Sequence, residues 1–147
     1  MLFAFIGCSC TGKSLAAETF QKSSHAAVYT GKDYLKLAKS PSQAKSLFEK
    51  QLQEAVSSNE LTIFVISEME EVNMLPEGAK KVLFTADLET IKSRFAVRMH
   101  GNLPAPVGAM LERKAHLFLD GTYDLTVHSD TSTPEEICAS IRQVLLS

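Results

Sequence analysis

The stretch Gly7-Cys8-Ser9-Cys10-Thr11-Gly12-Lys13-Ser14 follows directly after the apolar run Leu2-Phe3-Ala4-Phe5-Ile6. It matches the pattern G-x-x-x-x-G-K-S, the phosphate-binding loop known as Walker A. Glycines allow the backbone to turn tightly, so that its N–H groups can converge on anionic oxygens. The lysine of this pattern can reach the β- and γ-phosphates of a nucleotide, and the hydroxyl after it can ligate Mg²⁺. The expected nucleotide-contacting residues are Gly7, Cys8, Ser9, Cys10, Thr11, Gly12, Lys13, Ser14 and Leu15.

The segments on either side of this loop have the patterns that a Walker A loop requires. Residues 2–6 are wholly apolar, as expected of a buried parallel strand. Residues 13–23 contain no proline or glycine and place Leu15, Ala16 and Phe20 at helical spacing. The N-terminus of that helix would add its partial positive charge to the site. We therefore expect this strand–loop–helix unit to bind phosphate.

The composition predicts one globular domain over residues 1–147, with 45% hydrophobic and 22% charged residues. The net charge of −2 argues against a nucleic-acid partner, because proteins of that class present a basic surface. No apolar run approaches the ~20 residues of a membrane-spanning helix. The N-terminal run lacks the basic start of a secretory signal. We expect a cytoplasmic protein with no membrane partner.

Short apolar runs alternate with helical patterns along the chain, which is typical of a parallel α/β sheet. After the first strand, further strands are expected at residues 26–29, 61–66, 81–85 and 123–127. Helices are expected at residues 33–39, 43–58 and 109–119, from Asp87, and from the capping box Thr133-Pro134-Glu135-Glu136. This order predicts a three-layer, doubly wound α/β fold around a five-stranded parallel sheet.

Apolar residues at spacings of three and four predict the buried faces of two helices. In the helix at 43–58 the expected face consists of Leu47, Gln51, Leu52 and Ala55. In the last helix it consists of Ile137, Ile141, Val144 and Leu145.

A segment rich in helix-breaking residues lies at about residues 99–108 and is expected to form a short lid. Arg94 and Arg98 lie four residues apart on the helix before it, and Arg113 lies on the helix after it. Arginines around a mobile segment are suited to close over a transferring phosphoryl group and stabilise its charge. We predict that these three arginines take part in catalysis.

Acidic residues follow the second and third predicted strands, at the edge of the sheet where folds of this type bind ligands. Glu68 comes two residues after the third strand, where a carboxylate can assist Mg²⁺ or orient an acceptor hydroxyl. Asp33 follows the second strand and is the other candidate for an acceptor-side base. The sequence leaves the choice between Asp33 and Glu68 open.

The order of these parts resembles the small P-loop kinases, the group of the adenylate, shikimate and nucleoside kinases, over nearly the full length of the chain. Thr30-Gly31 followed by Asp33 is similar to the Thr-Gly-Asp segment of adenylate kinases. The spacing of Arg94 and Arg98 looks like their Arg-x-x-x-Arg entry to the lid. The resemblance implies a nucleotide-kinase-like P-loop NTPase fold, with ATP and Mg²⁺ as cofactors. It also implies an adenine site near residues 128–134.

The chain departs from these kinases after the third strand. Adenylate kinases carry Asp-Gly-Phe-Pro-Arg there, whereas this chain has Ser67-Glu68-Met69-Glu70-Glu71. An acidic segment without arginine favours a hydroxyl acceptor over a phosphate acceptor, because like charges repel. The glycine-rich segment of shikimate kinases is also missing, which argues against shikimate as the acceptor.

We therefore predict an ATP-dependent kinase that transfers the γ-phosphoryl group to a nucleoside, a nucleotide or another small hydroxyl acceptor. Two alternatives stay open: a non-catalytic ATP- or GTP-binding regulatory module, and an NTPase coupled to a partner protein. The acceptor, the preferred base and the oligomeric state are not determined by the sequence. The predicted catalytic residues are Lys13, Asp33, Glu68, Arg94, Arg98 and Arg113, with Ser14 and Glu68 as ligands of Mg²⁺.

Overall fold

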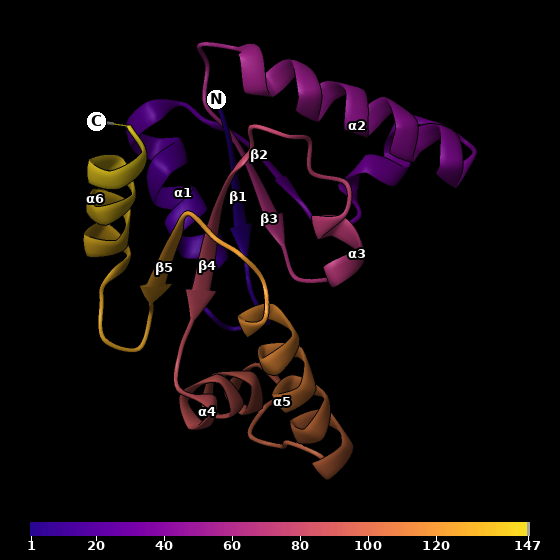
Figure 1. Cartoon of the computed structure of the whole chain (residues 1–147). Coiled ribbons are helices and arrows are strands. Elements are labelled where there is room, and N and C mark those ends of the chain that lie inside the picture. Colours follow the sequence, from indigo (N-terminus) through magenta and orange to yellow (C-terminus); the bar gives the residue numbers. More distant parts are fainter. Residues whose placement is uncertain (147) are drawn as a thin grey trace.

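The computed structural model describes residues 1–146, and in this range five parallel strands form one sheet in the order β2-β3-β1-β4-β5 (Figure 1). The central strand β1 pairs with β3 on one side and with β4 on the other, so that Phe3 lies opposite Ile63 and Lys80. The strands are β1 (Leu2–Ile6), β2 (Ala27–Thr30), β3 (Thr62–Ile66), β4 (Lys80–Thr85) and β5 (Leu125–His128). The predicted five-stranded parallel α/β fold is confirmed.

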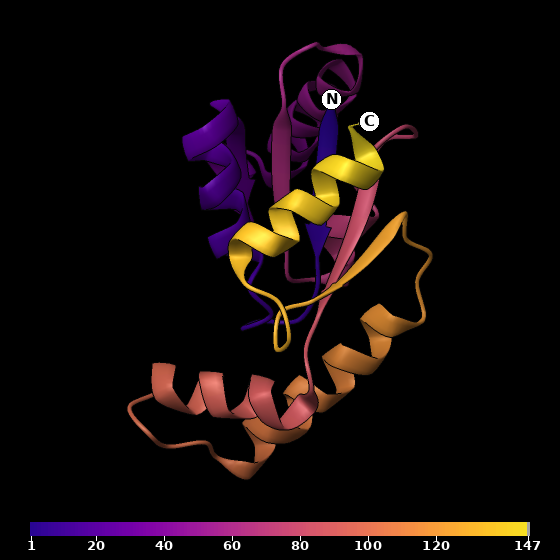
Figure 2. The ribbon, with the colours of Figure 1, turned by 90° about the vertical axis from the view of Figure 1, so that its left-hand side faces the viewer.

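Helices cover both faces of this sheet, which makes three layers (Figures 1 and 2). Each of the four crossovers between parallel strands contains at least one helix, as parallel pairing requires. The short helix α3 and the 3₁₀ form of η1 were not expected from the sequence. The helices are α1 (Lys13–Ser24), η1 (Asp33–Leu37), α2 (Pro41–Ser57), α3 (Met69–Val72), α4 (Leu88–Arg98), α5 (Ala105–Leu119) and α6 (Pro134–Leu145).

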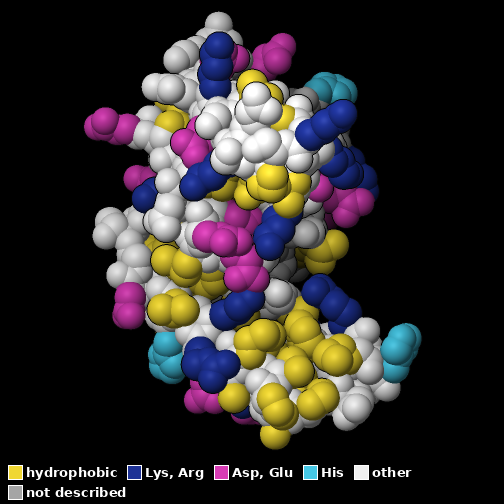
Figure 3. All heavy atoms as spheres, turned by 90° about the vertical axis from the view of Figure 1, so that its right-hand side faces the viewer, with side chains coloured by type: hydrophobic (Ala, Val, Ile, Leu, Met, Phe, Trp, Pro, Cys, Tyr) yellow, Lys and Arg dark blue, Asp and Glu magenta, His cyan; other side chains and the backbone are white. Residues whose placement is uncertain are grey.

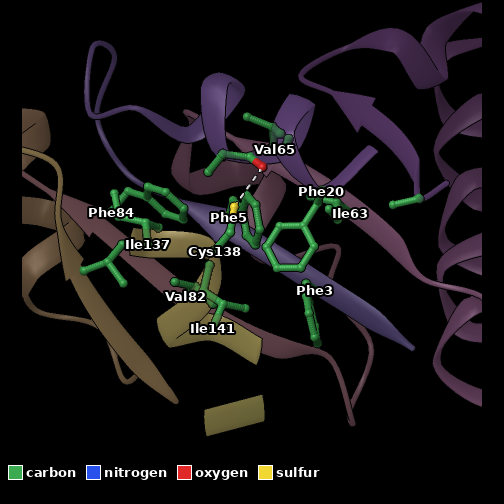
Figure 4. Packing of buried hydrophobic residues seen from close by; sticks show 14 of the residues in the cluster. Phe3, Phe5, Phe20, Ile63, Val65, Val82, Phe84, Ile137, Cys138 and Ile141 are labelled. Carbon is green, nitrogen blue, oxygen red and sulfur yellow. Dashed lines mark hydrogen bonds between the residues drawn. The ribbon is translucent and has the colours of Figure 1, made fainter. Parts of the chain in front are cut away.

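The side chains of β1 alternate between two buried clusters, one on each face of the sheet. Phe3 and Phe5 face α1 and α6, where the Phe20 ring packs against both at centroid distances of 6.3 and 6.0 Å (Figure 4). The Cys138 thiol of α6 donates to the carbonyl oxygen of Ala16 in α1 at 3.4 Å, which links the two helices of this layer. The opposite face of β1 packs against α2, α4 and α5.

The predicted buried face of α2 was wrong for two of its four residues. Leu47 and Gln51 are exposed, and Phe48 is buried in their place. Its ring lies 5.5 Å from that of Tyr34 and 5.0 Å from that of Phe64. Burying this aromatic ring beside two others outweighs the burial of one leucine, and it rotates the helix about its axis.

The last helix follows its prediction except at one position. The capping box between Thr133 and Glu136 is present, with each side chain accepting from the backbone N–H of the other residue. Ile141 and Leu145 are buried as predicted, whereas Val144 is 52% exposed and Cys138 takes part in the buried face instead. The cysteine lies next to α1, where its thiol has the hydrogen bond described above.

The helix expected from residue 109 begins four residues earlier, at Ala105. Pro104 and Pro106 therefore belong to the helix start, where a missing N–H has no intrahelical partner to lose. The segment between α4 and α5 is reduced to residues 99–104. His100 and Gly101 have positive φ there, and the N–H of Gly101 closes the end of α4 on the carbonyl of Ala96.

The two helices joined by this segment, α4 and α5, lie beyond the carboxyl ends of the strands (Figures 1 and 2). They pack against one another and frame the edge of the sheet that carries the phosphate loop. No helix in the described part of the chain combines the length and the apolar character needed to cross a membrane.

Candidate functional site

The phosphate loop between β1 and α1 is packed closely at both of its glycines. A Cβ atom at Gly7 would collide with the carbonyl oxygen of Phe84 at the end of β4. Gly12 has a φ of 88°, and a Cβ atom there would lie 3.1 Å from that of Ser129. The loop is therefore held between the ends of β4 and β5.

Lys13 is folded into the loop and only 5% exposed. Its ammonium group donates to the carbonyl oxygens of Gly7 and Cys8, at 2.6 and 2.7 Å. Burial lowers the pKa of Lys13 to about 8, against the opposing influence of Cys8, Cys10 and Glu71. A polyphosphate beside this amine would favour its charged form, so that anion binding and protonation of Lys13 support one another.

The phosphate loop forms one wall of an open pocket of about 450 Å³. The opposite wall comes from the β5–α6 loop and from the start of α6, and α4 contributes two arginines. The segment that was expected to hold adenine, residues 128–134, thus lines the same pocket as the phosphate loop. The pocket residues outside residues 9–15 are Ser67, Arg94, Arg98, Ser129, Ser132, Pro134 and Ile137.

Arg94 reaches this pocket from α4, and its two terminal guanidinium nitrogens make three hydrogen bonds to neutral groups. One nitrogen donates to the carbonyl oxygen of Cys10 at 3.0 Å and to the hydroxyl of Ser129 at 2.9 Å. The other donates to the carbonyl oxygen of Ser129 at 3.0 Å. Arg94 therefore connects the phosphate loop with the opposite wall.

The other two predicted arginines differ in their placement. Arg98 lies one turn further along α4, is exposed and lines the pocket, where its cationic head can meet an anionic ligand. Arg113 is exposed on α5 and lies outside the pocket lining. The structure brings Arg94 and Arg98 to the phosphate loop, and it does not bring Arg113 there.

The two acids predicted for the acceptor side both have partners. Asp33 accepts hydrogen bonds from the hydroxyl and the N–H of Thr30, which hold the pKa of its carboxyl below the usual range. Glu68 forms an ion pair with Lys114 of α5 at 2.5 Å. Neither acid lines the pocket, and the catalytic roles given to both stay predictions.

Glu71 is a buried acid outside the pocket lining whose charge acts on Lys13, and no role was predicted for it from the sequence. The residue is 1% exposed, and within residues 1–146 its Oε2 atom is the buried side-chain oxygen without a hydrogen-bond partner. Burial raises the pKa of Glu71, and its charge acts on Lys13. Three glutamates within four residues gave no signal as to which one points inward.

The edge of the sheet next to these acids carries charges of both signs. Lys32 pairs with Glu70 at 3.8 Å, beside the pair of Lys114 and Glu68. Figure 3 views the side of the molecule that carries α2, α3 and α5, where acidic and basic side chains are interspersed across the middle. Hydrophobic side chains gather in its lower part, over α4 and α5, and the face is hollowed between the two regions. Lys114 had no predicted role, because only its position in space links it to Glu68.

No protein-family model matches the chain, and no curated protein matches its sequence. Solved structures do match its fold over nearly the full length. A sugar kinase from Janibacter sp. has a TM-score of 0.69 at 14% identity, with 98% of this chain and 93% of that chain covered.

Two further structures contain bound ligands. Shikimate kinase from Acinetobacter baumannii in complex with shikimate has a TM-score of 0.66 at 11% identity, covering 99% of this chain and 92% of that one. The YorR protein from Bacillus subtilis in complex with phosphorylated GDP has a TM-score of 0.68 at 18% identity, with 99% and 96% covered. The chain thus has the fold of the small P-loop kinases.

Proposed function

We propose that this protein is a kinase that transfers the γ-phosphoryl group of ATP to a hydroxyl group of a small molecule. The observation that carries the proposal is the pocket in which the buried Lys13, Arg98 and the wall from Ser129 to Ile137 meet at the carboxyl edge of the sheet. This is where open parallel sheets bind their ligands. The kinase fold supports the same reaction class.

Different residues of the pocket are suited to different parts of a nucleoside triphosphate. The loop N–H groups and the ammonium of Lys13 are suited to the β- and γ-phosphates. Arg98 is placed to stabilise charge on the transferring group. Pro134 and Ile137 offer apolar surface to a base, and the hydroxyl of Ser132 adds a polar contact there.

The residues next to the loop also fit Mg²⁺. This ion is usually held by one or two protein oxygens together with substrate phosphates and water. Ser14 lines the pocket, and Glu71 has a buried carboxylate oxygen with no partner. Ser14 would therefore hold the ion from the pocket side, and Glu71, which lies outside the pocket lining, would supply the acidic ligand in place of Glu68, the acid predicted from the sequence. When bound, Mg²⁺ neutralises charge on the phosphates during transfer.

The acceptor that fits this edge best is an uncharged polyhydroxy compound. Two of the lysines at this edge, Lys32 and Lys114, already have acidic partners. A phosphate group would have to replace a carboxylate in one of these pairs and leave that carboxylate without a partner. A hydroxyl group can instead donate to the carboxylates without breaking either pair.

The proposal is tested by thermal unfolding with Mg²⁺–ATP alone and then with one acceptor class added at a time. The classes are neutral sugars and polyols, nucleosides, hydroxy acids and nucleoside monophosphates. We expect a rise in Tm with Mg²⁺–ATP, a second rise with a neutral polyol, and ADP release with that compound only. ADP release that needs no acceptor, or release with a monophosphate only, would contradict the proposed acceptor class.

A second candidate is a nucleotide-binding module without transfer activity. It is favoured because both acids predicted for the acceptor side already have partners. Asp33 accepts a hydrogen bond from Thr30, and Glu68 forms an ion pair with Lys114. A rise in Tm with Mg²⁺–ATP, without a further rise or ADP release for any acceptor class, would favour this candidate over the kinase.

A further inference from the structure

We infer that Arg94 is a positioning residue that holds the phosphate loop and the β5–α6 wall of the pocket at a fixed separation, rather than a ligand of the transferring phosphate. The inference rests on the proposed nucleotide site. It changes the role expected for this arginine from the sequence, which was closure over the phosphoryl group.

The first support is the set of groups that the guanidinium contacts. Its two terminal nitrogens make three hydrogen bonds, to the carbonyl of Cys10 and to the hydroxyl and carbonyl of Ser129. Each of these acceptors is neutral, and each is fixed in the fold. An arginine that has to move onto a phosphate would first break bonds that span two loops.

The second support is the strain and close approach at the same two points. Cys10 has a φ of 66°, which is unfavourable for a residue with a side chain, and its carbonyl is the one that Arg94 holds. Ser129 in turn lies against Gly12, so that the two walls of the pocket touch directly beside the arginine. Arg94 thus fixes the loop where its backbone is least favourable.

The third support is a second connection between the same elements. The N–H of Asp87, at the start of α4, donates to the carboxylate of Asp130 at 3.0 Å. Helix α4 is therefore attached to the β5–α6 loop at two places, through Asp87 and through Arg94 about two turns later. A displacement of α4 would move the wall that faces the base.

The phosphate cradle itself has internal bonds that do not involve Arg94. Thr11 donates to the carbonyl of Cys8 at 2.7 Å, and Lys13 donates to Gly7 and Cys8. A ligand that touches only the cradle should therefore tolerate the loss of Arg94. A ligand that touches both walls should not, because it needs them at a fixed separation.

The test compares inorganic tripolyphosphate with ATP, both with Mg²⁺, by calorimetric titration of Arg94→Ala, Arg94→Lys and Arg98→Ala. For Arg94→Ala we expect ATP affinity to fall at least tenfold and tripolyphosphate affinity to fall less than threefold. Arg94→Lys keeps the charge but not the planar fork, and it should show the same difference between the two ligands. For Arg98→Ala we expect both affinities to fall by a similar factor.

An equal loss of both ligands in Arg94→Ala and Arg94→Lys would identify Arg94 as a phosphate ligand and overturn the inference. Unchanged ATP affinity in both variants would overturn it as well. A wild-type protein that binds neither ligand would instead overturn the proposed function, so that the two failures are distinguishable. Arg94→Lys retains the long side chain, and its unfolding curve shows whether a loss of binding reflects a loss of fold.

Discussion

The pocket proposed to hold the nucleotide and the edge proposed to hold the acceptor, around Lys32, Glu68, Glu70 and Lys114, are built by different means. In the proposed nucleotide pocket, Lys13 is 5% exposed, a Cβ atom at Gly7 would collide with the backbone of β4, and Gly12 has positive φ. On the acceptor edge, Lys32 and Glu70 have side chains that are 63% and 68% exposed. The first region is determined by backbone packing, and the second by surface side chains that can change without affecting the fold.

This difference determines which part of the site a shared fold can fix. Proteins with 18% identity or less share the fold, and one of them was solved with shikimate and another with phosphorylated GDP. A fold of this kind fixes where phosphates bind, since that site is made of backbone N–H groups. It leaves the acceptor open, because exposed ion pairs contribute little to stability and are free to vary.

The largest effect is expected from Lys13→Met on the nucleotide side. Methionine keeps the apolar stem but removes the ammonium that donates to Gly7 and Cys8. We expect ADP release to fall by about a hundredfold or more, with the fold retained. Calorimetry and a steady-state assay measure this, with Lys32→Met on the acceptor edge as the control. Wild-type turnover in Lys13→Met would remove the loop from the mechanism.

The next effect concerns how firmly backbone packing fixes the loop. Gly7→Ala places a methyl group against the carbonyl of Phe84 and should lower the free energy of unfolding by about 3 kcal/mol. Gly31→Ala is the matched control, since Gly31 has positive φ but open space around it, and about 1 kcal/mol is expected. Denaturant unfolding measures both. Equal losses would mean that close packing does not set the loop apart.

A smaller effect should distinguish Glu71 from Glu68 as the acidic ligand of Mg²⁺. Glu71→Gln removes the buried carboxylate and should reduce the gain in ATP affinity on adding Mg²⁺ by about tenfold. Glu68→Gln, which removes the partner of Lys114, should change that gain less than twofold. Titrations with Mg²⁺ and with EDTA measure the gain. The reverse order would support Glu68 as the ligand predicted from sequence.

The smallest effect is a pH dependence of stability that arises from Glu71. Burial raises its pKa, with the charges of Glu68 and Glu70 acting in the same direction and backbone N–H groups opposing. The folded state then binds more protons than the unfolded state above the ordinary glutamate pKa of about 4.3. The free energy of unfolding should therefore fall as the pH rises from that value through the raised pKa.

Glu71→Gln should flatten this fall, because glutamine does not titrate. Glu70→Gln is the control, since Glu70 is exposed and paired with Lys32. Urea unfolding between pH 4.5 and 7.5 gives the slopes. A wild-type slope in Glu71→Gln would show that the buried acid titrates as it does in the unfolded chain.

The fold could be predicted because its signals are local and repeated. Each strand contains a short apolar stretch, which is longest in β1, and the loop after β1 has a fixed pattern of glycines, lysine and serine. The errors arose where distant packing decides. Phe48 rather than Leu47 faces the sheet because its ring packs against the rings of Phe64 in β3 and Tyr34 in η1. The start of α5 was missed because proline is typical both of loops and of a first helical turn.

The site was predictable in its location but not in its partners. Arg94, Arg98 and Arg113 were predicted to close over the transferring phosphoryl group, and of these Arg94 and Arg98 line the pocket whereas Arg113 does not. Nothing in the spacing indicated that Arg94 would bond to Ser129, which is 35 residues away. Likewise, Lys114 is 46 residues from Glu68. Such pairs depend on the tertiary structure, whereas the geometry of the phosphate loop is determined by residues next to one another in the sequence.

The pocket draws its two walls from opposite ends of the sequence, residues 9–15 and residues 129–137. During synthesis the phosphate loop therefore leaves the ribosome long before the segment that completes its binding site. The phosphate loop follows β1, and β4, which pairs with β1 in the sheet, also comes some 75 residues after it. A growing chain would acquire affinity for a whole nucleotide only as a late event, so that nucleotide present in the cell would stabilise finished molecules and not partial ones.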